Sequence, residues 1–310
     1  MNASANRELK LLGKSPEIAQ VRKAIKRLAK YDASILIVGE TGTDKAFIAE
    51  HIHLLSMHKD KPFVKIECGA IGDTLDPKVV FRLPQERTKP QTEGLVSADQ
   101  GTVYLNRIDK LEPDFQDRLY NFWVTALSRE EPAFSVRFIS SALPAIEKLE
   151  KTGEFREDLL QMLSHFRIST PPLRRRKQDI PFLFDNILKE FSQTYNKSYD
   201  NTPEEIFQAI INYGWPGNVR ELRNCVRNLV IMSPENNLDA RHLPFYTKPD
   251  PLEFMSDYDL PTAVEEVEKF LIKKALTRYE GNQSKAARIL AISEAALRYK
   301  MKKYGFPSAR

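Results

Sequence analysis

Cysteine is scarce in this sequence, and it has no long apolar run. Its two cysteines, Cys68 and Cys225, lie far apart and outside any CxxC pair, which excludes a disulfide framework and a cysteine-based zinc site. No apolar run approaches the roughly 18 residues of a membrane-spanning helix. The first ten residues also lack the apolar stretch of a secretion signal. We therefore expect a cytoplasmic protein without a membrane partner, in which both cysteines are buried as small hydrophobic residues.

The charge of the chain is concentrated near its C-terminus. The 310 residues, 42% hydrophobic and 29% charged, are typical of a globular protein with one large core and a small appended domain. Residues 262–310 hold eleven Lys and Arg against five Glu, a net charge of +6, whereas the whole chain carries +5. A small cationic segment on a near-neutral body is typical of nucleic-acid binding, although a solvated basic helix face has the same composition.

Strand-like and helix-like patterns alternate in the first half of the chain. Short apolar runs occur at residues 34–38, 63–66, 102–105 and 136–140. The spacing between them predicts an α/β fold, a parallel sheet with crossover helices. After Pro171 the apolar period becomes helical, at residues 180–195, 203–213 and 218–232, which predicts a helical lid on the α/β core.

The end of the chain has a separate organisation. Residues 233–262 collect Pro, Asp and Asn and lose their apolar period, which predicts a linker. Helical patterns return at residues 263–279, 284–290 and 293–304. We expect, in order, an N-terminal tail (1–10), an α/β subdomain (11–170), a helical lid (171–240), a linker (241–261) and a small all-α domain (262–310).

A modified phosphate-binding loop follows the first predicted strand. Residues 39–46, GETGTDKA, stand where the pattern GxxxxGK[ST] would lie, and such a loop binds phosphate through backbone N–H groups and its lysine. Asp44 replaces the second glycine, and its carboxylate would repel a polyphosphate and offer Lys45 a partner within the chain. Ala46 replaces the usual hydroxyl. The expected remnants of a nucleotide site are Gly39, Gly42, Thr43 and Lys45.

Several further motifs occur in a fixed order along the chain. They are Leu12-Gly13-Lys14-Ser15, Gly101-Thr102-Val103-Tyr104-Leu105, Phe155-Arg156-Glu157-Asp158-Leu159, Pro172-Leu173-Arg174 and Gly214-Trp215-Pro216-Gly217-Asn218-Val219-Arg220-Glu221-Leu222. With the loop, they make residues 11–232 resemble the AAA+ domain of bacterial enhancer-binding proteins, the NtrC-type activators that depend on sigma-54. The resemblance implies an AAA+ fold, ATP as the ligand and RNA polymerase holoenzyme as a partner.

The catalytic positions of that family are altered. Its Asp-Glu pair, which holds magnesium and activates water, is replaced by Asn106 and Arg107. An amide binds a hard cation more weakly than a carboxylate, and an arginine cannot act as a general base. Leu143 occupies a sensor position and Met162 that of the second arginine finger. We therefore predict a degenerate domain that is not an enzyme, with no metal site and no certain cofactor, although ATP binding stays open.

Two arginines of the family pattern are retained. Arg156 matches the first arginine finger, and Arg220 matches the sensor 2 arginine. Either they still face a nucleotide, or they now form structural ion pairs at a subunit or lid interface. His51 and His53, two residues apart on one predicted helix, face different directions and are poor joint metal ligands, so we expect them at the surface or an interface.

The loop that contacts sigma-54 in the family has no counterpart here. That loop carries the motif Gly-Ala-Phe-Thr-Gly-Ala, whereas residues 82–94 read RLPQERTKPQTEG. This stretch is also shorter than expected by roughly four residues. The sequence therefore predicts a regulator that works without sigma-54.

The C-terminal segment resembles a Fis-type helix-turn-helix. Residues 281–287 open a first helix, residues 290–292 form a turn, and Ser293 caps a second helix over 294–304. The candidate DNA-binding residues are Lys285, Ser293, Glu294, Arg298, Tyr299 and Lys302. Glu294 stands where the family has a basic or polar residue, which favours altered base readout, with cytosine as its partner.

The preceding helix predicts self-association. Val264, Val267, Leu271 and Ala275 have near-heptad spacing, which fits either a dimer or packing on the helix-turn-helix of the same chain. Taken together, the sequence predicts a DNA-binding transcription regulator that forms a dimer or higher oligomer. Two alternatives remain open: a weak ATPase that still activates sigma-54, and a sensor whose vacated pocket binds a cyclic dinucleotide, as in some members of the family.

Overall fold

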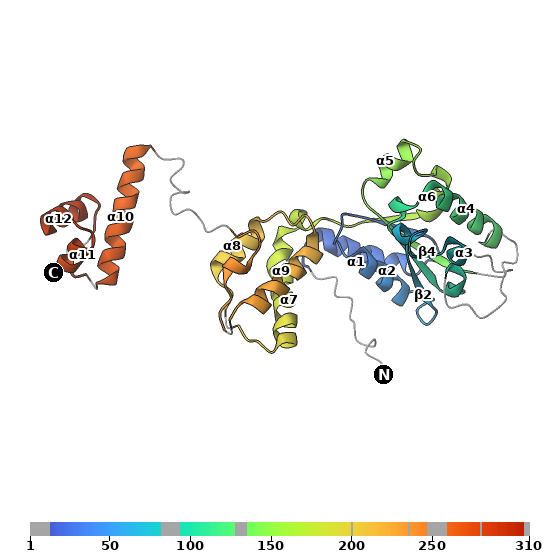
Figure 1. Cartoon of the computed structure of the whole chain (residues 1–310), viewed down its shortest axis with the longest axis horizontal. Coiled ribbons are helices and arrows are strands. Elements are labelled where there is room, and N and C mark those ends of the chain that lie inside the picture. Colours follow the sequence, from blue (N-terminus) through green and yellow to red (C-terminus); the bar gives the residue numbers. More distant parts are fainter. Residues whose placement is uncertain are drawn as a thin grey trace. The chain divides into compact units, whose positions relative to one another are not determined.

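The computed structural model describes residues 13–81, 94–127, 135–199, 201–234, 236–246, 259–279 and 281–306. The chain divides into two units, residues 1–246 and 247–310, which are described separately (Figure 1). The predicted N-terminal tail and most of the predicted linker lie outside the described residues, as do residues 82–93, where the sequence predicts an altered sigma-54 contact region. None of the helices in the described ranges combines the length and apolar composition that crossing a bilayer requires.

The first unit is built on a five-stranded sheet in which every neighbouring pair is parallel. The strands are β1 (Ile35–Val38), β2 (Phe63–Glu67), β3 (Thr102–Asn106), β4 (Arg137–Ala142) and β5 (Phe166–Ser169), in the order β2-β3-β4-β1-β5. The predicted α/β class with a parallel sheet is therefore confirmed. The strand β5 was not predicted from the sequence, because its four residues at the sheet edge include two exposed polar side chains.

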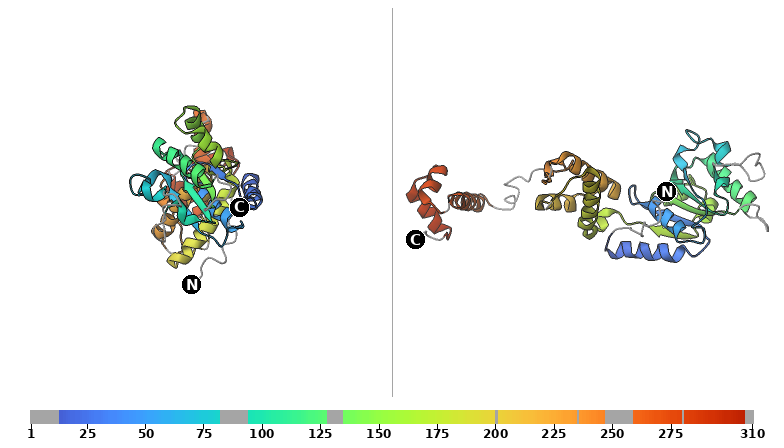
Figure 2. Two further views of the ribbon diagram at one scale, coloured as in Figure 1. Left: turned by 90° about the vertical axis from the view of Figure 1, so that its right-hand side faces the viewer. Right: turned by 90° about the horizontal axis from the view of Figure 1, so that it is seen from below.

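Helices cover both faces of this sheet (Figures 1 and 2). They are α1 (Pro16–Leu28), α2 (Lys45–Leu54), α3 (Pro77–Val80), α4 (Pro113–Leu127), α5 (Ile146–Lys151) and α6 (Glu157–Leu163). Side chains alternate along β1, so Ile35 and Ile37 pack with α1 and α2, whereas Leu36 packs with α4 and α6 on the other face. Both cysteines are buried, as predicted, and burial raises the pKa of the Cys225 thiol to about 12.

The helical lid has a core of its own, formed by α7 (Ile180–Tyr195), α8 (Glu204–Asn212) and α9 (Asn218–Met232). Trp215 is fully buried in it and donates its indole N–H to the Ile210 carbonyl at 2.7 Å. Asp179, at the start of the lid, is also fully buried and accepts hydrogen bonds from the backbone of Lys14 and Ser15. The carboxylate of Asp179 therefore joins the segment before α1 to the lid.

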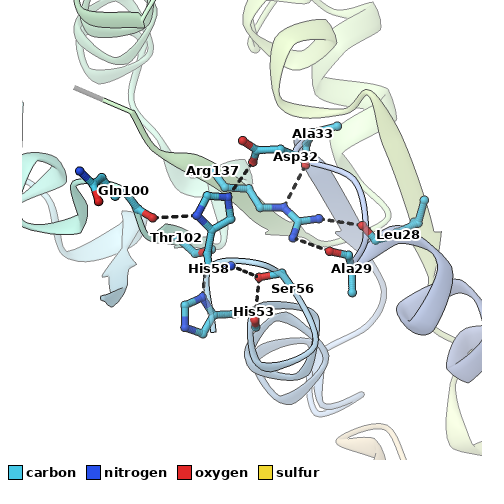
Figure 3. A network of polar contacts seen from close by, with 10 residues as sticks. All are labelled: Leu28, Ala29, Asp32, Ala33, His53, Ser56, His58, Gln100, Thr102 and Arg137. Atoms are coloured by element: carbon cyan, nitrogen blue, oxygen red, sulfur yellow. Dashed lines mark hydrogen bonds and ion pairs between the residues drawn. The ribbon is translucent and has the colours of Figure 1, made fainter. Parts of the chain in front are cut away.

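A buried polar network closes the end of the sheet where the strands begin (Figure 3). Arg137 is 3% exposed and donates to the backbone carbonyls of Leu28, Ala29 and Ala33. The imidazole Nδ1 of His53 lies 2.9 Å from the Thr102 hydroxyl. The prediction of surface positions for His51 and His53 is wrong, since both are 3% exposed. One face of α2 covers the sheet and buries His53. On the same helix, the tilted ring of Phe47 lies against the ring of His51.

The second unit consists of α10 (Leu260–Arg278), α11 (Gln283–Ile289) and α12 (Glu294–Lys303). Small Ala286 and Ala287 of α11 let the helices approach closely, and they share a core with Ile272 of α10 and Leu297 of α12. The Ser293 hydroxyl accepts a hydrogen bond from the Ala296 N–H at 3.1 Å and caps α12. Together α11 and α12 form a helix-turn-helix.

Candidate functional site

The modified loop keeps the backbone shape of a phosphate-binding loop. It leads from β1 into α2, whose first residue is Lys45. Asp44 adopts the left-handed conformation, with φ 60° and ψ 34°, at the position of the missing glycine. Aspartate tolerates this region better than most residues, because its short polar side chain hydrogen-bonds locally. Asp44 therefore adopts a left-handed backbone conformation that glycine adopts readily, and it adds a carboxyl group to the loop.

Lys45 is held by the loop itself. Its side-chain nitrogen donates to the carbonyls of Gly39 at 2.7 Å and Glu40 at 2.8 Å, and the residue is 8% exposed. It does not take Asp44 as an ion-pair partner, which corrects the expectation from the sequence, because the ammonium is turned back toward these carbonyls. Burial, with a contribution from Arg107, lowers the pKa of Lys45 to about 8. Burial also raises the pKa of Asp44 above its usual value.

A cavity of about 340 Å³ lies in front of this loop. It is lined by residues 41–47, Lys65, Asn106, Arg107 and Arg220. The fold thus brings together most of the sequence-predicted nucleotide residues from the loop, from the end of β3 and from the lid. Gly39 does not line the cavity, but its carbonyl oxygen accepts from Lys45, which does. Leu143, Arg156 and Met162 are not part of the lining either.

Asn106, at the end of β3, is engaged on both sides of its amide. Its nitrogen donates to the Glu67 carboxylate on β2 at 2.6 Å. Its oxygen lies 2.8 Å from the Ser141 hydroxyl and 2.9 Å from the Tyr104 hydroxyl. Burial raises the pKa of Tyr104 to about 12, so this phenol stays protonated. The amide oxygen of Asn106 therefore already accepts two hydrogen bonds, and an amide is a weaker ligand for a hard cation than a carboxylate.

Arg107 is fixed by an acidic partner two residues along the chain. Its guanidinium makes a two-pronged contact with Asp109, at 3.0 and 2.7 Å. The same carboxylate accepts the N–H of Leu143, the altered sensor position, at 3.0 Å. The Asp109 side chain is only 5% exposed, and it raises the pKa of Arg107. An arginine that is always charged and already paired cannot take a proton from water.

Magnesium, which the family resemblance implies, does not fit this arrangement. Mg²⁺ in nucleotide sites is bound through one or two carboxylates together with the phosphates. Asp44 is the one acidic residue that lines the cavity, beside four cationic ones, Lys45, Lys65, Arg107 and Arg220. Over the described ranges, no three His, Cys, Asp or Glu side chains are grouped so that they could hold a metal. We therefore derive no chemical step through a metal ion.

The retained finger arginine is bound within its own subunit. Arg156 forms ion pairs with Asp117 and with Asp158, and its guanidinium lies 4.2 Å from the centre of the Tyr120 ring. These partners lie on α4 and α6 of the α/β subdomain, and not at the lid. Met162, at the second finger position, contributes its backbone carbonyl to the Ser34 hydroxyl at 2.5 Å.

The sequence did not indicate that Glu40 and Asn218 belong to the site, although both join the loop to the lid. Glu40 accepts two hydrogen bonds from the Arg174 guanidinium, and this contact lowers the pKa of Glu40. Asn218, fully buried at the start of α9, donates to the Thr41 carbonyl at 2.9 Å. No pattern along the chain indicates these contacts, because the partners of Glu40 and Thr41 lie more than 130 residues away.

The helix-turn-helix presents a subset of its basic residues. Lys300 and Lys303 of α12 pair with Glu268 and Glu265 of α10, at 2.6 and 2.5 Å. The predicted DNA-binding residues Lys285, Ser293, Glu294, Arg298, Tyr299 and Lys302 are all exposed. Arg298 has only a loose contact with Glu294, at 3.4 Å. On α12, the cations available to a partner therefore lie on the side that faces away from α10, and Lys285 of α11 is exposed as well.

Both units match known domain families. Residues 11–169 match the sigma-54 interaction domain, residues 174–257 the AAA+ ATPase lid domain, and residues 263–304 the bacterial regulatory protein family of Fis type. The chain is 32% identical over 95% of its length to a signal-transduction and transcriptional-control protein of Clostridium beijerinckii, and covers 48% of that protein. It is 31% identical over 94% of its length to the transcriptional regulatory protein ZraR of Escherichia coli, and covers 68% of it.

Solved structures show the same architecture. NtrX from Brucella abortus, in complex with ADP, matches 96% of the chain with a TM-score of 0.68 and 27% identity, over 69% of the NtrX chain. NtrX in complex with ATP matches 96% of the chain with a TM-score of 0.67. The family match covers more than half of the chain. This chain therefore belongs to the NtrC-type family of sigma-54-dependent bacterial transcription regulators, with an AAA+ domain and a DNA-binding helix-turn-helix of the Fis type.

Proposed function

We propose that this chain is a sequence-specific DNA-binding regulator whose AAA+ domain does not hydrolyse ATP and which acts on RNA polymerase without sigma-54. The observation that carries the proposal is the pair Asn106 and Arg107 at the end of β3. The Asn106 amide donates to Glu67 and accepts from Ser141. The Arg107 guanidinium is paired with Asp109. These two positions therefore offer no carboxylate to a metal ion and no general base, which supports the proposal.

The family sites around this pair support the same conclusion. Asp44 stands in the loop, Leu143 at the sensor and Met162 at the second finger. Each of these changes acts on a different requirement of hydrolysis: phosphate binding, detection of the γ-phosphate and charge stabilisation from the neighbouring subunit. Their combination is what a domain without selection for turnover would accumulate. Absence of the sigma-54 contact motif from residues 82–94 favours action through another form of the polymerase holoenzyme.

A nucleotide remains a candidate ligand of the cavity. NtrX from Brucella abortus was solved with ATP and with ADP. In this chain Gly42, Thr43, Lys45 and Arg220 line the cavity at the corresponding loop and lid. We propose that these residues bind phosphate groups and that Gly39 supports them through Lys45. Binding without turnover would make the nucleotide a structural or regulatory ligand.

The DNA contacts are assigned to exposed residues of the helix-turn-helix. Lys285, Arg298 and Lys302 would bind phosphates, because a free cation near the backbone releases condensed counterions. Ser293, Glu294 and Tyr299 lie toward the N-terminal part of α12 or on its exposed side, where side chains reach base edges in this motif. Lys300 and Lys303 are excluded from this set, since their charges are neutralised by Glu268 and Glu265.

We also propose that α10 mediates self-association. Leu260, Val264 and Leu271 are 77%, 47% and 44% exposed, and with Val267 they follow heptad spacing along one side of the helix. Ala275, predicted to belong to this stripe, is instead buried in the core of its own helix-turn-helix. An exposed apolar stripe of this length is typical of a helix-helix interface.

Changing Val264→Glu together with Leu271→Glu should weaken this association. Two charges in a desolvated seam would lack partners, so the affinity of the dimer is expected to fall by at least about tenfold. Analytical ultracentrifugation of the full chain over a concentration series measures the effect. Lys273→Ala with Lys274→Ala, which changes the net charge by the same −2 at exposed positions of α10, is the control for charge. Unchanged association in the Val264→Glu, Leu271→Glu protein would move the interface elsewhere.

The test of the proposed function combines two assays on one preparation. Selection of duplexes from a random pool by the purified chain should enrich a two-fold symmetric sequence, without any added nucleotide. Phosphate release from ATP with magnesium should not exceed the rate measured without protein. Magnesium-dependent turnover would replace the proposal with a weak ATPase, and failure to enrich any sequence would remove the helix-turn-helix as the reading head.

A further inference from the structure

The cavity in front of the loop has an unusual charge balance. Among the described residues, its lining contains four cationic side chains, Lys45, Lys65, Arg107 and Arg220, and one carboxylate, that of Asp44. Arg107 and Lys65 also have carboxylate partners just outside the lining, Asp109 and Glu67. Desolvation of Asp44 favours its neutral form and so reduces its negative charge further. The positive charge comes from the loop, from β2, from the end of β3 and from α9. A concave site with cations on several sides is suited to a compact polyanion.

Two of these cations form no ion pair with a carboxylate among the residues that the structure describes. Lys45 is 8% exposed, and its ammonium donates to backbone carbonyls rather than to a carboxylate. Arg220 is placed at the cavity through its backbone N–H, 3.3 Å from the Gly42 carbonyl oxygen. The positive charge of Arg220 acts on the Asp44 carboxyl, whose desolvation outweighs that attraction. A bound anion would attract the ammonium of Lys45 and so oppose the desolvation that lowers the pKa of this residue.

The other two cations stand beside the position of the family's metal ligands. Arg107 directly follows Asn106 and is held in place by Asp109, 2.7 Å away. Lys65 lies on β2, and its ammonium is 3.8 Å from Glu67, which in turn accepts from Asn106. A divalent cation here would meet the fixed guanidinium of Arg107 and an amide oxygen that is already hydrogen-bonded. The region is therefore unfavourable to a metal ion but favourable to phosphate oxygens.

We infer that the cavity binds a di- or triphosphate group directly, without a metal ion, and that Arg107 and Lys65 supply the positive charge that magnesium supplies in an active nucleotide site. The inference rests on the proposed absence of hydrolysis and extends it to the form of the ligand. A volume of about 340 Å³ is within the range of small-molecule sites. The same chemistry is present in a nucleoside triphosphate and in inorganic tripolyphosphate, so both are probes.

Calorimetric titration of the full chain with ATP, in magnesium and in excess EDTA, tests this inference. The affinity in EDTA should equal or exceed that in magnesium, because the metal-free ligand carries more negative charge. A second titration with tripolyphosphate identifies the source of the phosphate chain. Binding of both probes indicates recognition of phosphates alone, and binding of ATP alone adds a requirement for the base. A fall in ATP affinity when magnesium is removed, or binding of neither probe, would overturn the inference.

Single substitutions test which cations of the cavity contribute to phosphate binding. Arg107→Gln should weaken binding in EDTA by at least about tenfold, equivalent to about 1.4 kcal/mol, whereas Arg107→Lys should keep most of it. Arg118→Gln, the same change at an exposed arginine of α4 outside the cavity, is the matched control. Melting curves without ligand show whether each variant folds. If the Arg107→Gln protein does not fold, Lys65→Gln removes a second positive charge of the cavity and serves in its place. Equal affinities of the Arg107→Gln and Arg118→Gln proteins would refute the role of Arg107.

Phosphate release measured in the magnesium samples separates this inference from the proposed function. Hydrolysis of ATP would contradict the non-hydrolysing domain, whereas the affinities in EDTA would still decide whether phosphates bind without metal. Conversely, a protein that neither hydrolyses nor binds ATP would retain the proposed function and lose this inference.

Discussion

Restoring the two family carboxylates, by Asn106→Asp with Arg107→Glu, is expected to leave ATP hydrolysis at the background rate. A general base contributes typically about 10²–10⁴-fold, but only where its partners are in place. In this chain the carboxylate introduced at position 106 would face Glu67 across the 2.6 Å contact that Asn106 now makes. The carboxylate introduced at position 107 would face Asp109, which would lose the guanidinium that pairs with it. The double variant would also keep Asp44 in the loop, Leu143 at the sensor and Met162 at the second finger, so these requirements of hydrolysis would stay unrestored.

The same double change should also destabilise the fold. The Asp109 side chain is 5% exposed, so removing its cation leaves a nearly buried charge with only the Leu143 N–H as a partner. Loss of such a partner, together with the new repulsion, is expected to cost at least about 2 kcal/mol of unfolding free energy. The unfolding midpoint in urea measures this cost. The expected outcome is thus a less stable protein without a gain in turnover.

A matched control separates charge from position. Asn224→Asp with Arg227→Glu makes the same change of charge at exposed positions of α9 and should alter the midpoint little. Phosphate release is measured for the wild type and both double variants over a range of magnesium concentrations. Substantial hydrolysis by the Asn106→Asp, Arg107→Glu protein would show that the loop, sensor and finger changes do not matter, and the domain would then be one pair of residues away from activity.

Changing Arg298→Ala together with Lys302→Ala should weaken DNA binding about 10- to 100-fold and make it less sensitive to salt. Each phosphate contact adds about 0.9 to the slope of log affinity against log salt, so losing two should lower the slope by about 2. Both residues are exposed on α12, and Ser293 orients this helix through its cap. The charge of Arg298 is only loosely engaged by Glu294. These cations are therefore available to phosphates.

A duplex of mixed sequence suffices for this measurement, because phosphate contacts do not depend on base sequence. Fluorescence anisotropy over a series of salt concentrations gives both the affinity and the slope. Lys273→Ala with Lys274→Ala removes the same two charges from exposed positions of α10 and should have a smaller effect on both. If the two double variants lose equal affinity, the effect is one of net charge, and α12 is not the reading head.

The sequence was sufficient to predict the fold of both units. Apolar runs such as residues 34–38 and 102–105 mark buried parallel strands, because both faces of such strands are covered by helices. The same pattern missed β5, whose edge position leaves Arg167 and Ser169 in solvent. The cap of the helix-turn-helix is also a local signal, since the Ser293 hydroxyl accepts from the N–H of Ala296, three residues along the chain.

The sequence by itself also determined which catalytic residue types are lacking, because identity at a motif position is a local property. Tertiary structure alone decided what the replacements do. Contacts of Asn106 with Glu67 and Ser141 span 39 and 35 residues, and those of Arg174 with Glu40 span 134. Likewise, Glu268 and Glu265 decide which lysines of α12 stay free. Pairing of charges depends on which side chains the packed helices and strands bring within a few ångströms, and no spacing along the chain encodes that distance.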